Sequence, residues 1–303
     1  MIEDVSREML KNQIETIFDV IKVDAVKIGM VNSKENGEIM YEKLLKYKAQ
    51  NEKFSCLTCY DASFAHLMQK ADIDVILVGD SLGMVVQGHA STLPVTVEDM
   101  AYHTANIARS NSHALIMCDL PFMSYATSND AILSTQKVMQ AGANMIKIEG
   151  GRNLASTVET LANHGVPSCV HLGLTPQSVN IFGGYKVQGK NQEAADKLLE
   201  DCRILTDSGA AMILLECVPF DLAKTITQTF NVPVIGIGAG VETDGQVLVM
   251  HDMLGVYTRK PAKFVKNFLT DASNQTSDIL GAFSAYHQAV KTASFPAHEH
   301  TFY

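Results

Sequence analysis

The sequence predicts an α/β fold of the (β/α)₈ TIM-barrel class, and three observations support this prediction. From Phe54 onward, short apolar runs recur that are typical of parallel strands buried on both faces. Amphipathic helical patterns separate most of these runs. The alternation of strand and helix continues over roughly 200 residues, as a closed barrel requires. A doubly wound open sheet is the alternative, but it needs fewer strands.

Eight strands are expected, at residues 56–61, 74–81, 114–120, 145–150, 168–172, 212–218, 234–238 and 248–251. Helices are expected between most of them, at residues 63–71, 97–110, 129–141, 154–164, 192–208 and 222–230. The connection between the last two strands has room for only about two helical turns. Helical patterns at 261–269 and 274–293 should then cover the outside of the barrel or exchange with a neighbouring subunit.

The first 50 residues do not follow this alternation. Residues 6–20 have helical spacing and VDAVKIGM, at 23–30, has the pattern of a strand, which together are too small to bury a core. VDAVKIGM resembles a fragment of a ribokinase-like hydroxymethylpyrimidine phosphate kinase, without any catalytic loop of such a kinase. We therefore expect residues 1–40 to be an accessory or poorly ordered extension. Residues 41–303 should form the catalytic barrel, with 41–50 as a helix that closes its bottom.

Composition excludes several classes of function. The chain has 303 residues, 47% of them hydrophobic, which is enough for one large core with a short appendage. A formal charge of −9 argues against nucleic acid as the main partner, because binding phosphates needs a clustered basic surface. No apolar run is long enough to span a bilayer, and the acidic start lacks the features of a signal peptide. We therefore expect a soluble, cytoplasmic protein without a membrane partner.

The six cysteines lie mostly inside apolar, strand-like runs, and we expect them to be buried, reduced thiols. Cys56 and Cys59 form a C-x-x-C pair, for which redox or zinc chemistry is the alternative. Residues three apart in a strand point to opposite faces, however, and no second Cys or His pair follows at zinc-site spacing.

Acidic residues stand where several predicted strands end. The glycine-rich stretch 78–96 opens with Asp80 and Ser81 as the second strand leaves the core, and Asp119, Glu149 and Glu216 follow later strands. A carboxylate at such a position needs a cation, a metal ion or a proton to neutralise it. Because the carboxyl ends of barrel strands meet at one face, we expect these side chains to share one site.

Asp80, Asp119 and Glu149 follow three consecutive strands, which is suitable geometry for a hard divalent cation bound by oxygen ligands. The absence of an H-x-x-x-H motif or of clustered Cys and His disfavours zinc. For any one of these residues, or for Asp61 after the first strand, helix capping or solvation is the alternative. Asp119 precedes Leu-Pro and Glu149 precedes two glycines, so neither has the context of a regular helix start.

Lys147 and Glu149 point to the same side of the fourth strand by their period of two. Lys147 could fill an ion pair or anchor a substrate carboxylate, and the second role predicts a small anionic substrate. A Schiff-base role is opposed by the neighbouring carboxylates, which favour the charged amine. His171 could be a core histidine, but its position before GLTPQS favours a place in the site.

Glu216 lies in the apolar strand ILLECVP, where burial would suit it to proton transfer near neutral pH, with a structural ion pair as the alternative. Two glycine-rich loops complete the pattern. Residues 181–190 follow the fifth strand and could act as a lid. Residues 235–240, IGIGAG, predict a tight turn that gives a flat ligand close access to the backbone.

Longer strings carry a family resemblance. VGDSLGMVVQGHASTLPVTVEDMAYHT, CDLPFMSYAT, AGANMIKIEGG, HLGLTPQSVNIFGGYKVQGK, LLECVP, and PVIGIGAG followed by DGQVLVMHD closely resemble the ketopantoate hydroxymethyltransferase family. The resemblance runs from about Lys46 to the C-terminal helices. It implies a barrel of the phosphoenolpyruvate/pyruvate type and transfer of a hydroxymethyl group from 5,10-methylenetetrahydrofolate to 3-methyl-2-oxobutanoate. It further implies an Mg²⁺-stabilised enolate and 2-dehydropantoate as the product, for pantothenate and coenzyme A biosynthesis.

The resemblance also implies roles for single residues. Asp80 and Asp119 would bind Mg²⁺, and Glu149 would do so directly or through water. Asp80, Asp119, Ser81 and Lys147 would bind the oxo acid, and Glu216 would transfer the proton. From its position at a strand end, and not from the resemblance, we expect His171 to lie behind these groups and support them. The family implies a homo-oligomer, often a decamer. Ala90 and Cys59 depart from the family pattern but are none of the assigned residues.

Two other functions remain open at this point. A carbon–carbon lyase of the related phosphoenolpyruvate/pyruvate barrels would share a metal-bound enolate, but the K-x-C-G-H loop of those lyases does not occur here. A catalytically silent barrel that serves only as an assembly scaffold is disfavoured by the complete set of acidic and basic residues named above.

Overall fold

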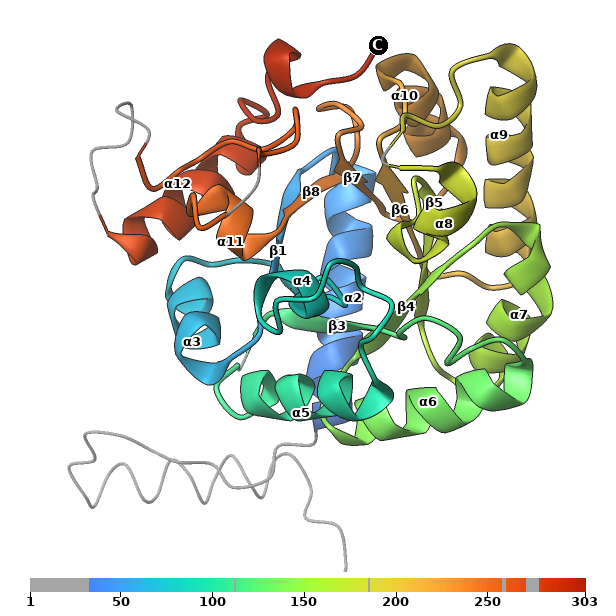
Figure 1. The fold of residues 1–303 in the computed structure, drawn as a ribbon, viewed down its shortest axis with the longest axis horizontal. Coiled ribbons are helices and arrows are strands. Elements are labelled where there is room, and N and C mark those ends of the chain that lie inside the picture. The colour runs from blue at the N-terminus through green and yellow to red at the C-terminus, as the bar shows by residue number, and fades with distance from the viewer. Residues whose placement is uncertain (1–32, 112, 185, 258–259, 271–277) are drawn as a thin grey trace, which may run out of the picture. The chain divides into compact units, whose positions relative to one another are not determined.

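Eight parallel strands close into a barrel in sequence order (Figure 1). The computed structural model describes residues 33–111, 113–184, 186–257, 260–270 and 278–303, and the barrel lies in the compact unit Lys34–Tyr303. The strands are β1 Phe54–Thr58, β2 Val75–Val78, β3 Leu115–Asp119, β4 Met145–Glu149, β5 Ser168–Gly173, β6 Met212–Glu216, β7 Val234–Ile237 and β8 Gly245–Leu248. β8 pairs with β1 in parallel and completes the ring. The predicted fold class is confirmed.

Helices surround the barrel (Figure 1). The longer ones on its outside are α3 Ala62–Lys70, α5 Val97–Ala108, α6 Ser128–Gln140, α7 Ala155–Asn163, α9 Gln192–Asp207, α10 Phe220–Thr229 and α12 Ile279–Lys291. Short helical segments occur in the loops, namely α4 Leu82–Val85, η1 Arg152–Leu154, η2 Pro176–Ser178, α8 Val179–Phe182, α11 Met250–Met253 and η3 His298–His300. None of the described helices is both long and apolar enough to cross a bilayer.

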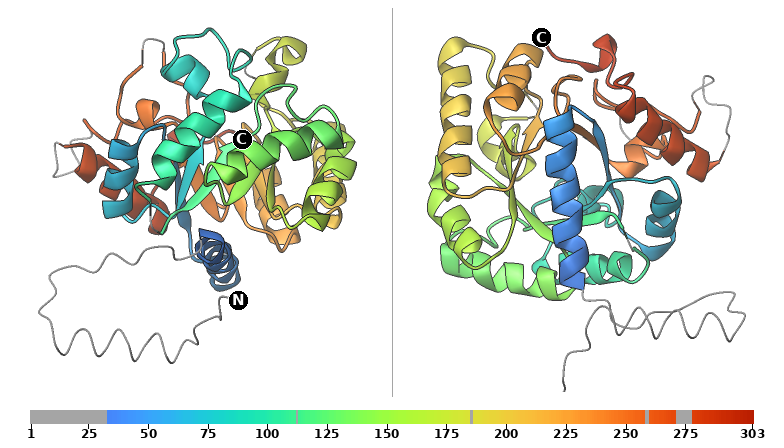
Figure 2. Two further views of the ribbon diagram at one scale, coloured as in Figure 1. Left: turned by 90° about the horizontal axis from the view of Figure 1, so that it is seen from below. Right: turned by 180° about the vertical axis from the view of Figure 1, so that it is seen from behind.

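The core has two parts, one between the strands and the outer helices and one inside the barrel. Helix α2, Ser33–Gln50, closes the interior part, because Met40 and Leu44 belong to it. The Tyr41 hydroxyl donates to the Ala211 carbonyl at 2.7 Å, and Lys48 Nζ lies 2.7 Å from Asp244 Oδ2. Seen from behind, α2 crosses the end of the barrel (Figure 2). This is the expected closing helix, although it begins at Ser33, earlier than predicted.

Several predicted elements were placed wrongly. The last strand is β8, Gly245–Leu248, and not 248–251, because the barrel accepts polar Gln246, whose amide donates to the Gly240 carbonyl at 2.9 Å. Only a turn joins β7 to β8, without the expected helical turns. Residues 261–269 form no helix, since tertiary packing of Phe268 against Tyr286 and Phe295 overrides the helical spacing.

Some predictions are not tested by the described residues. The expected strand and helix at 6–30, and the start of the helix expected at 274–293, lie outside the described residues. The division into residues 1–40 and 41–303 stays a prediction. All six cysteines are free and buried, as expected.

Helix α12 packs against α3 and β1 through fully buried Tyr286, whose hydroxyl donates to the carbonyls of Cys56 at 2.9 Å and Gln246 at 2.8 Å. Tyr286→Phe should lower the free energy of unfolding by about 1 kcal/mol, because two buried carbonyls lose their shared donor. Chemical denaturation would measure this. Tyr303→Phe is the matched control, because Tyr303 is 64% exposed. Equal denaturation midpoints for the two variants would contradict the role given to the Tyr286 hydroxyl.

Candidate active site

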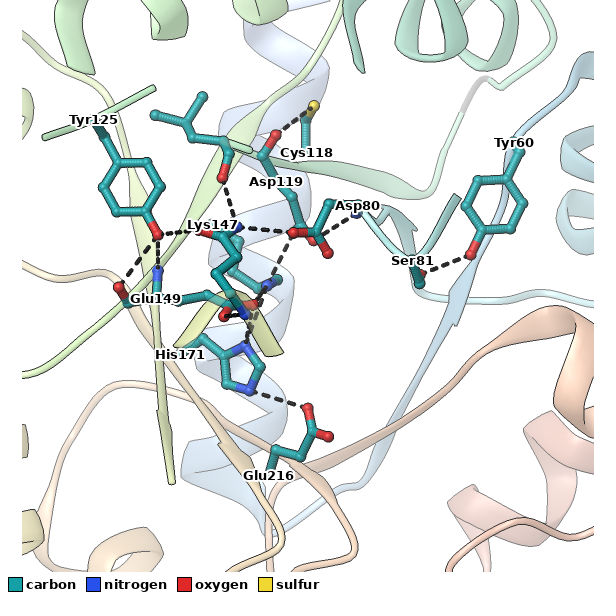
Figure 3. A network of polar contacts seen from close by, with 12 residues as sticks. Tyr60, Asp80, Ser81, Cys118, Asp119, Tyr125, Lys147, Glu149, His171 and Glu216 are labelled. Carbon is teal, nitrogen blue, oxygen red and sulfur yellow. Dashed lines mark hydrogen bonds and ion pairs between the residues drawn. The ribbon is translucent and has the colours of Figure 1, made fainter. Parts of the chain in front are cut away.

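The charged residues singled out in the sequence meet at the carboxyl ends of neighbouring strands (Figure 3). Asp80 follows β2, Asp119 ends β3, Lys147 and Glu149 lie in β4, His171 in β5, and Glu216 ends β6. The strand register pairs Asp119 with Lys147 and Glu149 with His171, which sets these side chains next to one another. The structure therefore gathers the predicted residues into one cluster, while their roles stay predictions.

Asp80 and Asp119 form the acidic end of the cluster, and both are buried. The Asp80 backbone N–H donates to Asp119 Oδ2 at 2.9 Å. The other oxygen, Asp119 Oδ1, lies 3.1 Å from Lys147 Nζ but accepts no well-directed hydrogen bond from the described residues. Glycine at position 79 leaves room for the Ser81 side chain, because a Cβ there would lie only 2.8 Å from Ser81 Oγ.

Lys147 occupies the middle of the cluster. Its ammonium lies 3.1 Å from Asp119 Oδ1 and 3.3 Å from Glu149 Oε1. Burial alone would lower the pKa of Lys147, but the carboxylates of Asp119 and Glu149 outweigh it and raise that pKa well above the usual value. Lys147 is therefore an ammonium at neutral pH, which opposes Schiff-base chemistry as expected.

His171 connects Glu149 to Glu216. Its Nδ1 lies 3.1 Å from Glu149 Oε1 and its Nε2 lies 3.2 Å from Glu216 Oε2. Burial and the Lys147 ammonium each lower the pKa of His171. The Glu149 charge and the contacts with both carboxylates outweigh these two effects and raise that pKa to about 9. Burial raises the pKa of Glu149, yet Lys147 and His171 prevail and lower it to about 2. The Glu216 side chain is 13% exposed, so it is less enclosed than its apolar strand suggests.

Ser81 stands beside Asp80 at the end of a short chain of hydroxyl groups. Ser81 Oγ lies 2.9 Å from the Tyr60 hydroxyl, which donates to Thr58 Oγ1 at 2.9 Å. Asp61, by contrast, caps α3, because its side chain accepts from the backbone N–H groups of Ser63 and Phe64. Of the acidic residues at strand ends, Asp61 is thus a helix cap.

Two residues of the cluster escaped the sequence analysis. Gln177 in η2 donates to Asp80 Oδ2 at 2.8 Å and, through its backbone N–H, to Glu149 Oε2 at 3.0 Å. The Tyr125 hydroxyl lies 2.5 Å from Gln177 Oε1. Both stand in strings that carry the family resemblance, HLGLTPQS and CDLPFMSYAT, but neither spacing nor periodicity marks them as site residues.

The cluster offers a divalent cation two adjacent carboxylates rather than three. Within the described parts of the chain, no three His, Cys, Asp or Glu side chains form a group that could hold a metal, and Glu149 is turned toward Lys147 and His171. Asp80 and Asp119 remain as a pair. Burial, and then the Asp119 carboxylate, raise the pKa of Asp80 well above its usual range.

The charge of the cluster favours a dication. Four carboxylates face one lysine and one histidine, which leaves an excess of two negative charges when all are ionised. Mg²⁺ is typically held by one or two carboxylates, with substrate and water as its other ligands. Two adjacent buried aspartates, with Asp119 Oδ1 accepting no hydrogen bond from the described residues, therefore fit Mg²⁺.

The two glycine-rich loops, 181–190 and 235–240, make different contacts. The loop at 181–190 is tied to the site end of β6, because the Gln188 N–H donates to the Cys217 carbonyl at 2.9 Å; its action as a lid stays a prediction. In 235–240, a Cβ at Gly238 would lie 2.9 Å from the Phe264 ring, and one at Gly240 2.5 Å from the Phe220 ring. These glycines therefore make room for the chain's own aromatic rings. A surface groove of about 530 Å³ beside α9 and α10 contains none of the clustered residues.

Comparisons with known proteins agree with the family resemblance. The ketopantoate hydroxymethyltransferase family model matches residues 38–298, and the phosphomethylpyrimidine kinase model matches residues 1–53. The chain is 62% identical over 259 residues to 3-methyl-2-oxobutanoate hydroxymethyltransferase of Psychrobacter cryohalolentis, covering 86% of this chain and 97% of the relative. It is 62% identical over 265 residues to the enzyme of that name in Acinetobacter baumannii strain AYE, covering 87% and 98%.

Solved structures share the fold at low sequence identity. Phosphoenolpyruvate phosphomutase from Streptomyces platensis has a TM-score of 0.55 at 12% identity, covering 71% of this chain and 82% of its own. 2,3-Dimethylmalate lyase, a member of the PEP mutase/isocitrate lyase superfamily, has a TM-score of 0.52 at 17% identity, covering 73% and 81%. Phosphonopyruvate hydrolase in complex with oxalate and Mg²⁺ has a TM-score of 0.55 at 10% identity, covering 69% and 80%. These likenesses confirm the barrel type.

Proposed function

The chain belongs to the ketopantoate hydroxymethyltransferase family, and we propose that Asp80, Asp119, Lys147 and Glu216 perform the family reaction together with Mg²⁺. The enzyme transfers a hydroxymethyl group from 5,10-methylenetetrahydrofolate to 3-methyl-2-oxobutanoate, a reaction of pantothenate biosynthesis. The observation that carries the residue assignment is the pair of adjacent buried aspartates, Asp80 and Asp119. The buried Lys147 ammonium lies next to Asp119 and Glu149, and His171 connects Glu149 to Glu216.

Asp80 and Asp119 would hold Mg²⁺, with Glu149 acting through a water molecule because its carboxylate is already bound to Lys147 and His171. The metal would supply a Lewis acid for the keto and carboxylate oxygens of the oxo acid. One fold neighbour, phosphonopyruvate hydrolase, is described with oxalate and Mg²⁺, and oxalate is also an anion with adjacent carboxylate and carbonyl oxygens. The complex of that neighbour supports the proposal that the carboxyl ends of the barrel strands bind Mg²⁺ together with an oxo acid.

Lys147 and Ser81 would bind the oxo acid. The Lys147 ammonium keeps its charge among the carboxylates and so offers a fixed positive centre to an anionic substrate. The Tyr60 hydroxyl donates its single proton to Thr58 Oγ1, so the Ser81 hydroxyl donates to Tyr60 and would turn its proton to a substrate oxygen when the oxo acid binds. Both residues border the aspartate pair, so they would hold the substrate carboxylate and keto group at the metal.

Glu216 would remove the proton from C3 of the oxo acid. Its side chain is 13% exposed, and its Oε2 lies 3.2 Å from Nε2 of the buried His171. His171 is itself held by Glu149, so it fixes the orientation of Glu216 without contacting substrate. General-base transfer from a positioned carboxylate contributes about 10²- to 10⁴-fold to a rate.

We further propose a cytoplasmic homo-oligomer, often decameric in this family, that binds neither nucleic acid nor membrane. Tyr102 in α5 and Leu133 in α6 are more than half exposed, and an interface between subunits would cover them. Residues 1–40 are proposed as an accessory extension to the catalytic barrel of 41–303.

Exchange of the C3 proton of 3-methyl-2-oxobutanoate in D₂O tests the metal and the base together. The protein with Mg²⁺ should exchange this proton without any folate, and a chelator should slow the exchange by at least about a hundredfold, because the charge formed on the oxo acid loses its Lewis acid. NMR follows the exchange directly. If the chelator left the rate of proton exchange unchanged, the proposed role of Mg²⁺ would be refuted. Aldol cleavage of a larger acid would favour a lyase, and no reaction at all would favour a scaffold.

A further inference from the structure

We propose that Gln177 is a positioning residue that holds Asp80 in its metal-binding orientation. The inference rests on the proposed function, because it takes Asp80 and Asp119 as the Mg²⁺ ligands. Gln177 comes from η2, 97 residues further along the chain than Asp80, so only the barrel fold brings the two together.

The side chain of Gln177 is buried and uses both ends of its amide. Its Nε2 donates to Asp80 Oδ2 at 2.8 Å and to the Leu120 carbonyl at 3.0 Å. With Oδ2 of Asp80 engaged in this way, the carboxylate cannot rotate freely. A group that donates a hydrogen bond to a ligating carboxylate fixes the orientation of that ligand and so raises the affinity of the site for its metal.

Tyr125 fixes which end of the amide faces Asp80. The Tyr125 hydroxyl donates to Gln177 Oε1 at 2.5 Å. If the amide were turned over, its NH₂ group would face this hydroxyl and its oxygen would face the Asp80 carboxylate. Two acceptors would then oppose each other in a buried place, which is costly.

The backbone of Gln177 is held as firmly as its side chain. Its N–H donates to Glu149 Oε2 at 3.0 Å, and Pro176 occupies the first turn of η2 with its restricted φ. Gln177 therefore contacts two of the three acidic residues assigned to the metal, Asp80 and Glu149, from a fixed position. The amide is already oriented before a metal or substrate arrives, so binding does not have to order it.

Mn²⁺ binding to the full-length protein, followed by electron paramagnetic resonance of the free ion, tests the proposal without depending on activity. Gln177→Met keeps the length of the side chain but removes both donors. It should raise the Kd for Mn²⁺ about tenfold, the lower end of the effect of removing a partner that orients a ligand. In the transfer assay, the Mg²⁺ concentration for half-maximal rate should rise likewise, whereas kcat at saturating Mg²⁺ should change little.

Gln188→Met is the matched control from the same connection between β5 and α9, since the Gln188 side chain donates to the Lys186 carbonyl at an exposed position. It should leave the Kd for Mn²⁺ unchanged. Tyr125→Phe keeps Gln177 but frees its amide oxygen, and should raise the Kd about threefold in the wild-type background. The Tyr125 hydroxyl also contacts the backbone N–H and carbonyl of Glu149 at 3.2 Å, so the double variant shows how much of the effect of Tyr125 passes through Gln177.

Three outcomes would overturn the proposal. If Gln177→Met folds and binds Mn²⁺ as tightly as the wild type, Gln177 does not position Asp80, although the metal site itself stands. If Gln177→Met does not fold, an unchanged Kd for Tyr125→Phe has the same meaning. If the wild type does not bind Mn²⁺, or if Asp119→Asn binds it as tightly as the wild type, the proposed metal site is wrong. The role of Gln177 is then wrong as well.

Discussion

Asp119→Asn should lower the rate of hydroxymethyl transfer by at least about a thousandfold, the largest effect that we expect from a substitution that preserves side-chain volume. The amide keeps an oxygen that can accept from the Asp80 N–H, so local geometry is preserved. It loses the negative charge that pairs with Lys147 and would bind the metal. Losing several kcal/mol of metal stabilisation corresponds to three or more factors of ten in rate. Steady-state kinetics with Mg²⁺, together with the Mn²⁺ Kd, would measure both losses.

Asp61→Asn is the informative control for Asp119→Asn. Asp61 is also an acidic residue beside a barrel strand, but its carboxylate caps α3, and asparagine is an equally good capping residue. Activity and stability should therefore change little. If Asp119→Asn remained folded and kept its rate within tenfold of the wild type, the aspartate pair would not be the metal site.

Asp61 and Asp119 also illustrate what the sequence could predict. Both follow apolar runs, and only the residues after them distinguish a cap from a site residue: Ala-Ser begins α3, whereas Leu-Pro prevents a helix. The alternation of side chains along β4 likewise predicted that Lys147 and Glu149 would share a face, and they lie 3.3 Å apart. That the charged residues of different strands share one site followed from the predicted barrel, because a barrel brings the ends of successive strands to one face.

The residues that sequence reasoning missed depend on packing between distant segments. Gln177 reaches Asp80 from a loop, and no local pattern marks a glutamine as the partner of a carboxylate 97 positions earlier. The same limit explains the misplaced eighth strand, since Gln246 becomes acceptable in a buried strand only when Gly240 and Thr243 fold back to accept its hydrogen bonds. Periodicity predicts elements, but contacts between loops are decided by the closed fold.

Glu216→Gln should lower both hydroxymethyl transfer and C3 proton exchange by about a thousandfold, within the range for a positioned general base. The glutamine side chain has the same shape and can still contact His171 Nε2, which lies 3.2 Å from Glu216 Oε2 in the wild type. It cannot take up a proton from C3. The Kd for Mn²⁺ should stay close to the wild-type value, because Glu216 is separated from the aspartate pair by His171 and Glu149. NMR exchange in D₂O and metal titration on the same preparation would show this combination.

Glu242→Gln is the matched control, because Glu242 is a surface carboxylate whose Oε2 lies 3.6 Å from Lys224 Nζ, and its loss should leave both rates unchanged. The two reactions of Glu216→Gln need not fail together, and this separates two mechanisms. If proton exchange persisted while transfer was lost, Glu216 would act after C3 has lost its proton, and another group would be the base. Loss of exchange with metal binding intact assigns the proton to Glu216, because the same Lewis acid then remains in place without a group to receive the proton.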